Sequence, residues 1–192
     1  MARATAAEAA QTAQRLLETA TQVFAAQGFA DTSLVDVAQR AGVTRGAIYH
    51  HYQNKAGLFY AVVARLQEQI AEAVLRTAED AGSSPSTQLR AGAHAFLDAI
   101  TAPAVVRILL VDAPAVVGWD EWRQLDAQSS EVLLREVLQE LGVEKELVGA
   151  LTAQLSGAMD EAALWVAQHD YEEQARTQAH RALDYLLASV MP

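Results

Sequence analysis

The sequence has 192 residues, which is enough for one domain or two small ones with a sizeable core. It has no cysteine, which excludes a disulfide framework, a thiolate nucleophile and Cys-ligated zinc, and suits a reducing cytoplasm. Its 14 Lys and Arg residues against 24 Asp and Glu give a net charge of -10, which by itself argues against a nucleic-acid partner.

The composition predicts an all-α protein of about nine helices. Helix formers dominate, with 40 Ala against only 10 Gly and 4 Pro. The longest strongly apolar run, residues 104–111, is interrupted by Arg107. That run is far shorter than the roughly 20 residues of a membrane span, so we expect no membrane partner.

The first two helices are predicted by apolar spacing and by their end signals. Apolar residues between Ala13 and Phe24 recur at helical intervals, and Gly28 follows as a C-terminal cap. A much shorter helix begins near Ser33, which forms a variant of the capping box with the acid three residues later, and Gly42 ends it.

A third and a fourth helix follow at once. Thr44 is placed to cap a helix that runs to residue 49 or 50. Asn54 is placed to cap a long helix, 54–81, with apolar residues at helical spacing. Two short helices joined by a tight turn, residues 33–52, form a helix-turn-helix pattern.

The rest of the chain is predicted to be helical after a linker at residues 82–85. We divide the sequence into an N-terminal domain, 1–53, the connecting helix, 54–81, and a C-terminal domain, 82–192. Within the last of these, Gly and Pro residues separate predicted helices at 86–101, 104–111, 119–141, 144–168 and 171–190.

The charges are unevenly distributed along the chain. Residues 1–60 contain five basic and four acidic residues, whereas residues 61–192 contain nine basic and 20 acidic ones. From Val37 to Gln67 there is no Asp or Glu at all, and this window coincides with the helix-turn-helix pattern. The absence of carboxylates removes repulsion from phosphates, so this segment is suited to nucleic acid although the whole chain is acidic.

The second helix of the pattern carries the side chains that DNA recognition needs. Ala47 and Ile48 are available for packing, and Gly46 and Ala47 would let the backbone approach a duplex closely. Arg45 could be an ordinary solvated arginine, but its place at the helix start favours DNA contact. Adjacent histidines diverge by about 100° on a helix, which favours His50 facing outward and leaves His51 for packing or surface. The donors expected on the outer face are Thr44, Arg45, Tyr49 and His50.

Residues 15–63 resemble the N-terminal domain of the tetracycline-repressor-type (TetR) family of transcriptional regulators. The resemblance rests on the Phe24–Phe29 junction, the Ala-Gly-Val turn at 41–43, the Gly46–Tyr49 stretch, and Asn54-Lys55 leading into Leu58-Phe59. It implies an all-helical homodimer whose two recognition helices contact successive half-sites of a palindromic double-stranded DNA operator. It also implies a C-terminal domain that binds a small molecule and the partner subunit.

Carried over residue by residue, the resemblance places DNA contacts on nine positions. Lys55 matches a lysine that typically touches phosphate, and the start of the second helix often does the same. The implied DNA-contacting residues are Thr32, Ser33, Thr44, Arg45, Gly46, Ala47, Tyr49, His50 and Lys55.

The C-terminal domain offers a weaker signal for a ligand pocket. Its histidines lack the spacing of a metal site with Glu or Asp, so we predict no metal, no catalytic residue and no cofactor other than the unknown effector. Each aromatic residue taken alone favours plain core, but together they could line an apolar pocket. The acidic charge of this domain would suit an apolar or cationic amphiphile. The candidate lining residues are His94, Phe96, Trp119, Trp122 and Trp165.

The last two predicted helices carry long apolar stripes with small residues that allow close helix approach. Such stripes usually serve the protomer's own core, and part of each must do so here. The resemblance places a four-helix dimer interface on these helices, which favours dimerisation. The candidate interface residues are Leu151, Leu155, Ala158, Ala162, Ala179, Leu183 and Leu186.

These observations predict a cytoplasmic, ligand-responsive DNA-binding regulator, most often a repressor in this family, that a small-molecule effector releases from its operator. Two alternatives remain at this point. One is a helical-bundle enzyme, for which the sequence has no phosphate loop, nucleophile elbow or metal-ligand spacing. The other is a small-molecule-binding or partner-binding protein that keeps the helix-turn-helix only as scaffold.

Overall fold

The structure is a computed structural model that describes residues 6–191, with side chains from residue 10 onward. The first five residues of the expected N-terminal domain and Pro192 lie outside the described part. The described residues form helices and short connections without a strand, which confirms the all-α fold. The helices are α1 (Ala6–Asp31), α2 (Leu34–Ala41), α3 (Arg45–Tyr52), α4 (Lys55–Asp80), α5 (Pro85–Ile100), α6 (Pro103–Val105), the π-helical η1 (Val106–Asp112), α7 (Ala113–Val116), α8 (Trp119–Ala127), α9 (Ser130–Glu140), α10 (Lys145–Gln168) and α11 (Glu173–Ala188).

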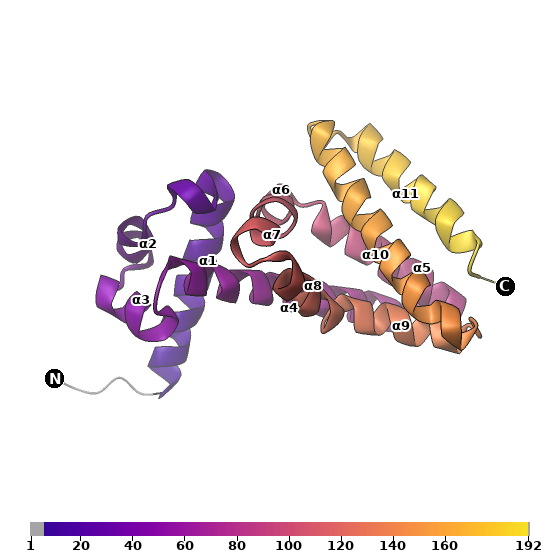
Figure 1. Ribbon diagram of the computed structural model, residues 1–192, viewed down its shortest axis with the longest axis horizontal. Helices are drawn as coiled ribbons and strands as arrows, with labels where there is room; N and C mark the ends of the chain where they lie inside the picture. The colour runs from indigo at the N-terminus through magenta and orange to yellow at the C-terminus, as the bar shows by residue number, and fades with distance from the viewer. Residues whose placement is uncertain (1–5, 192) are drawn as a thin grey trace.

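The molecule is elongated, and α4 runs along most of its length (Figure 1). Helices α1, α2 and α3 cluster at the N-terminal end, and α5 with α8 to α11 form a bundle at the other end. Between them, α6, η1 and α7 form a short helical segment that contacts both α1 and α4. Because α4 packs against helices at both ends, a displacement of α4 would change the packing at each end.

The polar caps that the sequence predicts are formed. Ser33 Oγ accepts a hydrogen bond from Val35 N, Thr44 Oγ1 accepts one from Ala47 N, and Asn54 Oδ1 accepts one from Gly57 N. Gly42 ends α2 in the left-handed conformation, with φ 67° and ψ 29°. These local signals fix the starts of α2, α3 and α4 and therefore the geometry of the helix-turn-helix.

The first helix breaks at Gly28, as predicted, but one further turn follows it to Asp31. Gly28 has φ 79° and ψ 171°, a conformation that L side chains rarely adopt. A Cβ atom at this position would also collide with the guanidinium of Arg107, which approaches the helix end from η1. The break therefore needs glycine for its backbone conformation, whereas the flexible end of the Arg107 side chain could move aside.

Two predicted helix boundaries differ in the structure. The expected helix 119–141 is interrupted between α8 and α9, where Ser129 Oγ donates to the carbonyls of Leu125 and Asp126 and offers the backbone an alternative to helix. The expected helix 104–111 instead continues through η1 into α7. There the Ala113 amide bonds to Ile108 O five residues back, and Pro114 supplies no amide hydrogen.

An aromatic cluster joins α1 to α4. The ring of Phe24 packs edge-on against Phe59 at 4.9 Å between centroids, and Phe29 packs against Phe59 at 5.1 Å. Phe24 and Phe59 are fully buried. This contact fixes the first turns of α4 against the helix-turn-helix.

No single helix among residues 6–191 combines the length and the apolarity needed to cross a membrane. The pair Pro85–Ile100 and Pro103–Val116, bent by 73°, meets the criteria of length and composition only when taken together.

Candidate nucleic-acid interface and ligand cavity

Helix α3 is held by one apolar face and exposes the other. Ile48 of α3 is fully buried. On the neighbouring helix, α2, Val37 and Ala38 are buried as well. Arg45, Gly46 and His50 are exposed, and Ala47 is partly buried. The sequence prediction that Ile48 packs inward while the N-terminal residues of α3 face solvent is therefore confirmed.

Arg45 and Tyr49 interact with each other one helical turn apart. Arg45 Nη2 donates a hydrogen bond of 2.9 Å to the Tyr49 hydroxyl, and its guanidinium carbon lies 5.1 Å from the ring centroid. Both side chains remain exposed. The contact restricts two long side chains on the outer face of α3, which lowers the entropy that binding would cost.

His50 and His51 are both exposed, with ring centroids 5.2 Å apart. His50 faces outward, as predicted. For His51 the sequence left packing or surface open, and the structure places it on the surface. Both imidazoles lie in the last turn of α3.

Four of the predicted contact residues form bonds inside the protein, and one of them, Thr44, does so as the cap of α3. Thr32 is only 4% exposed, and its Oγ1 donates to Gly28 O at 2.7 Å. Ser33 caps α2. Lys55 Nζ donates to three carbonyls, those of Phe29, Ala30 and Thr32, at 2.8, 3.0 and 3.0 Å. An ammonium group has three N–H donors, so these bonds leave none of them for a phosphate.

Lys55 and Gly57 together fix the start of α4, and sequence reasoning missed this role for both. The Lys55 ammonium caps the end of α1 and lies 4.6 Å from the Phe29 ring centroid. A Cβ atom at Gly57 would collide with the carbonyl oxygen of Tyr52, so glycine lets α4 begin directly against the end of α3.

A polar connection that the sequence did not reveal links the α1 end to η1. Asp112 Oδ2 accepts a hydrogen bond of 2.9 Å from the Phe29 amide, and Arg107 Nη2 donates to Gln27 O. Arg107 Nε also lies 4.0 Å from Asp112 Oδ2. The segment between the two ends of the molecule therefore holds the turn that precedes α2.

The predicted pocket residues do not all line one cavity. His94 bonds to Asp184 and His180 on α11, and Trp165 packs against His169. Trp119 is 63% exposed and stacks near the buried Trp122. Of the five, only Phe96 lines the cavity described next, because helical spacing does not determine which neighbouring helix a face meets.

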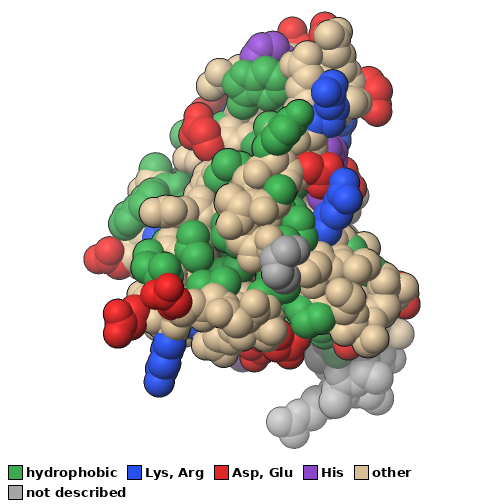
Figure 2. Space-filling model, turned by 90° about the vertical axis from the view of Figure 1, so that its right-hand side faces the viewer, with side chains coloured by type: hydrophobic (Ala, Val, Ile, Leu, Met, Phe, Trp, Pro, Cys, Tyr) green, Lys and Arg blue, Asp and Glu red, His purple; other side chains and the backbone are tan. Residues whose placement is uncertain are grey.

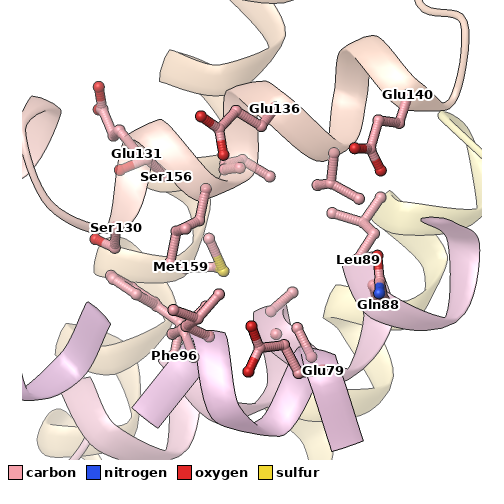
Figure 3. Close-up of a pocket in the computed structure, with 18 residues that line it drawn as sticks. Glu79, Gln88, Leu89, Phe96, Ser130, Glu131, Glu136, Glu140, Ser156 and Met159 are labelled. Carbon is pink, nitrogen blue, oxygen red and sulfur yellow. The ribbon is translucent and has the colours of Figure 1, made fainter. Parts of the chain in front are cut away.

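A cavity of about 250 Å³ lies between α4, α5, α9 and α10 (Figure 3). Leu89, Phe96 and Met159 give it an apolar wall. Glu79 enters from α4, and Glu136 and Glu140 enter from α9 around the same space (Figure 3). This combination of apolar wall and a few polar groups is typical of small-molecule sites.

A buried acidic cluster lies behind this cavity. Arg123 pairs with Asp126 and Glu131, and Asp126 also accepts hydrogen bonds from Ser130 and Ser156. Burial, followed by the nearby Glu131 charge, raises the pKa of Asp126, although Arg123 and the two serines oppose this.

Asp160 on α10 belongs to the same cluster and forms no hydrogen bond with another described residue. Burial is the main cause that raises the pKa of Asp160, to about 7, and the charges of Asp126 and Glu131 add to it while Arg123 opposes it. One guanidinium therefore serves three carboxyl groups, and Asp160 is the member that remains without a direct partner.

The α10–α11 face divides the predicted interface residues between two roles. Leu155, Ala179 and Leu183 are buried within the protomer, so their main packing is internal. Leu151, Ala158 and Ala162 are partly buried, and Leu186 is 46% exposed. Figure 2 looks at this end of the molecule and shows hydrophobic side chains exposed among acidic and basic ones.

Comparisons with known proteins cover both ends of the chain. Residues 86–190 match the family described as "Tetracyclin repressor-like, C-terminal domain", and residues 16–62 match "Bacterial regulatory proteins, tetR family". The structure is similar to a TetR-family transcriptional regulator from Pectobacterium atrosepticum, with a TM-score of 0.76, 31% identity and 98% coverage of each chain.

Curated relatives are transcriptional regulators that match over part of their length. The HTH-type transcriptional regulator SrpR of Pseudomonas putida is 43% identical over 54% of this chain and 46% of its own length. The regulator AcrR of Shigella flexneri is 40% identical over 47% of this chain and 42% of its own. The chain thus spans about half the length of these relatives. A FadR regulator from Bacillus subtilis in complex with stearoyl-CoA has the same fold, with a TM-score of 0.78, 15% identity and coverage of 91% of this chain and 97% of its own.

Proposed function

The chain belongs to the TetR family of transcriptional regulators, and from this we propose that it is a ligand-responsive repressor that acts in the cytoplasm and binds a palindromic operator as a homodimer. The observation that carries the proposal is the outer face of α3. It exposes Arg45, Tyr49 and His50 within a segment that contains no carboxylate from Val37 to Gln67.

The proposed DNA contacts are narrower than those the sequence suggested. Arg45 and Tyr49 lie one turn apart and are already oriented together, which suits them to a base edge and an adjacent phosphate. Gly46 lets the start of α3 approach the duplex closely. Thr32 and Lys55 are assigned a supporting role, because their polar atoms hold the α1 end. The proposed contact residues are Thr44, Arg45, Gly46, Ala47, Tyr49 and His50.

We assign a separate role to each of the three parts of the chain. Residues 1–53 bind DNA, α4 connects, and residues 82–192 bind the effector and the second subunit. The exposed apolar side chains on α11, Leu186 at 46% and Tyr185 at 78% exposure, support a dimer face there together with Leu151, Ala158 and Ala162 on α10. A two-fold interface of this kind would set the separation of the two α3 helices.

Release by effector is proposed to act through α4 and η1. The cavity wall includes the C-terminal part of α4, while the N-terminal turn of the same helix is tied to the α1 end by Lys55. The Asp112 bond to the Phe29 amide provides a second connection. A ligand that shifts these elements would change the spacing of the recognition helices away from half-sites about 34–36 Å apart.

The test is selection of bound sequences from random double-stranded DNA by the full chain, followed by measurement of stoichiometry. We expect a palindromic site whose half-sites are about one helical turn apart, occupied by two chains. Leu186→Asp should lose the dimer and most of the operator affinity, whereas Val111→Asp, on an exposed residue of η1, should not. Enrichment of no sequence above the random pool would contradict the proposal.

A further inference from the structure

The cavity between α4, α5, α9 and α10 has a one-sided charge. Four of its lining residues are glutamates, Glu79, Glu131, Glu136 and Glu140, and none of its described lining residues is Lys, Arg or His. Glu131 is paired with Arg123. Glu79, Glu136 and Glu140 are exposed and form no ion pair with another described residue. Three uncompensated carboxylates therefore surround an apolar space.

A second, much smaller cavity lies directly behind the first and continues the same charge. Phe96 and Ser130 belong to the walls of both cavities, and Asp126 and Asp160 line the inner one. No basic residue appears among its described lining residues. The inner cavity, at about 10 Å³, has room for at most one water molecule, so a ligand in the outer cavity would contact the glutamates and the apolar surface and would have the carboxyl groups of Asp126 and Asp160 behind that surface.

The inner cavity also contains polar atoms that have no partner. Gln67 is 6% exposed, and its Oε1 accepts no hydrogen bond from the part of the chain that the structure describes. Trp122 Nε1 is likewise buried without an acceptor. Leaving such atoms unpaired is costly, so each favours an occupant that would satisfy it. Of these two unpaired atoms, Gln67 Oε1 is an acceptor and Trp122 Nε1 is a donor.

We propose that this cavity binds a hydrophobic organic cation, with its apolar body against Leu89, Phe96 and Met159 and its positive charge among the surrounding carboxylates. This deepens the proposed function, on which it rests, by naming the chemical class of the effector. The apolar wall supplies burial, and the exposed, unpaired glutamates supply a charge attraction that water and salt partly screen. A ligand that carries a carboxylate or phosphate would be placed among like charges, without a basic residue to receive it.

The effector class proposed for this chain differs in charge from the ligand of a regulator with the same fold, which is known in complex with stearoyl-CoA, a ligand with phosphate groups. Shared fold at 15% identity does not carry a shared ligand. The charge of the wall is a property of this chain's own residues, and it selects against an anionic headgroup at the rim of the cavity.

The test compares two probe ions of nearly equal size and opposite charge, tetraphenylphosphonium and tetraphenylborate, by calorimetric titration into the DNA-free full chain. We expect the cation to bind at least about tenfold more tightly, which corresponds to about 1.4 kcal/mol. The variant Glu79→Gln/Glu136→Gln/Glu140→Gln should reduce this preference about tenfold. Its three positions are exposed, so circular dichroism should show an intact fold.

A matched control keeps the total charge change the same. Glu144→Gln/Glu146→Gln/Glu173→Gln removes three other exposed glutamates that lie outside the wall of this cavity. It should leave the preference for the cation unchanged. Equal binding of both ions, tighter binding of the anion, or an equal loss in the two triple variants would overturn the inference.

The failure of this inference and the failure of the proposed function are distinguishable, because operator binding is measured separately. The same variants are titrated with the selected operator in the absence of either ion, and both should bind it as the unmodified chain does. Operator binding combined with no preference for the cation would refute the effector class and leave the regulator proposal standing.

Discussion

The outer face of α3 and the cavity between α4 and α10 lie at opposite ends of one molecule and carry opposite charges. The α3 face presents Arg45 and two histidines without a carboxylate in its segment, while the cavity is lined by glutamates without a basic residue. The net charge of -10 averages these two surfaces and describes neither. The comparison teaches that the charge of a local surface, rather than of the chain, decides which partner it attracts.

The largest expected difference between the two sites is their response to salt. If the dimer contacts about 6–10 phosphates, operator affinity should fall by roughly 10³ to 10⁵ between 50 and 200 mM salt. Binding of a single monovalent cation in the cavity should fall less than about tenfold over that range, because it releases few ions. Titrations of both ligands at four salt concentrations check this, and parallel slopes would remove the distinction between the sites.

Arg45→Ala should weaken operator binding by roughly 100-fold, since a good arginine contact contributes about 1–3 kcal/mol and the dimer has two copies. Binding of tetraphenylphosphonium should not change. The matched control is Arg76→Ala, which removes an exposed arginine in the C-terminal half of α4 whose Nε donates to the carbonyl of Glu72. An Arg45→Ala protein with the operator affinity of the control would show that α3 does not carry recognition.

Asp160 should make the effector end less stable as pH rises. The pKa of Asp160, about 7, lies above the ordinary value for an aspartate, so the folded protein binds this proton more tightly than the unfolded chain does. The stabilisation that results is fully present below about pH 4 and is lost as the pH rises through 7. Asp160→Asn removes this titration and should raise the free energy of unfolding at pH 8, relative to the unmodified chain, by on the order of 3 kcal/mol. At pH 4 the two proteins should be nearly equal.

Chemical denaturation at both pH values measures this difference. Asp120→Asn, which neutralises an exposed aspartate at the start of the same helix that carries Asp126, serves as the control and should change little at either pH. If the stabilisation by Asp160→Asn is the same at pH 4 and pH 8, the carboxyl group does not titrate in this range.

Asp112→Ala should give the smallest effect, on the connection between the two ends. It leaves the Phe29 amide without its acceptor, which should destabilise the protein by about 1–2 kcal/mol and speed hydrogen exchange at the end of α1. Operator affinity without effector should change less than about threefold, while release by tetraphenylphosphonium should weaken. Unchanged exchange at the α1 end and unchanged release would contradict the role given to this bond.

Local features of the DNA-binding end could be predicted from the sequence because they depend on near neighbours. Ser33, Thr44 and Asn54 cap helices through amides two or three residues away, and Gly42 ends α2 through its own backbone conformation. The inward packing of Ile48 follows from its spacing alone. The three bonds from Lys55 to the carbonyls at the α1 end could not be predicted, because only the tertiary fold sets where those carbonyls lie.

The lining of the cavity could not be predicted, because it depends on which helices pack against each other, and the sequence pattern does not show this. Of the five aromatic and histidine residues expected to line it, Phe96 lies in the wall of the outer cavity, Trp122 lines only the inner one beside Phe96, and the other three lie elsewhere. Glu79 ends one helix, and Glu136 and Glu140 lie one turn apart on another, which is an ordinary pattern for a solvated helix surface. Nothing in their spacing shows that α4 and α9 face each other across an opening.

The central claim is that a surface suited to a polyanion and a cavity suited to a cation are linked in one molecule. The most direct test is fluorescence anisotropy of labelled operator bound to the full chain, titrated with tetraphenylphosphonium and, in parallel, with tetraphenylborate. The account predicts that the cation releases the operator at concentrations at which the anion does not. Release by both ions at equal concentrations, or by the anion alone, would contradict it.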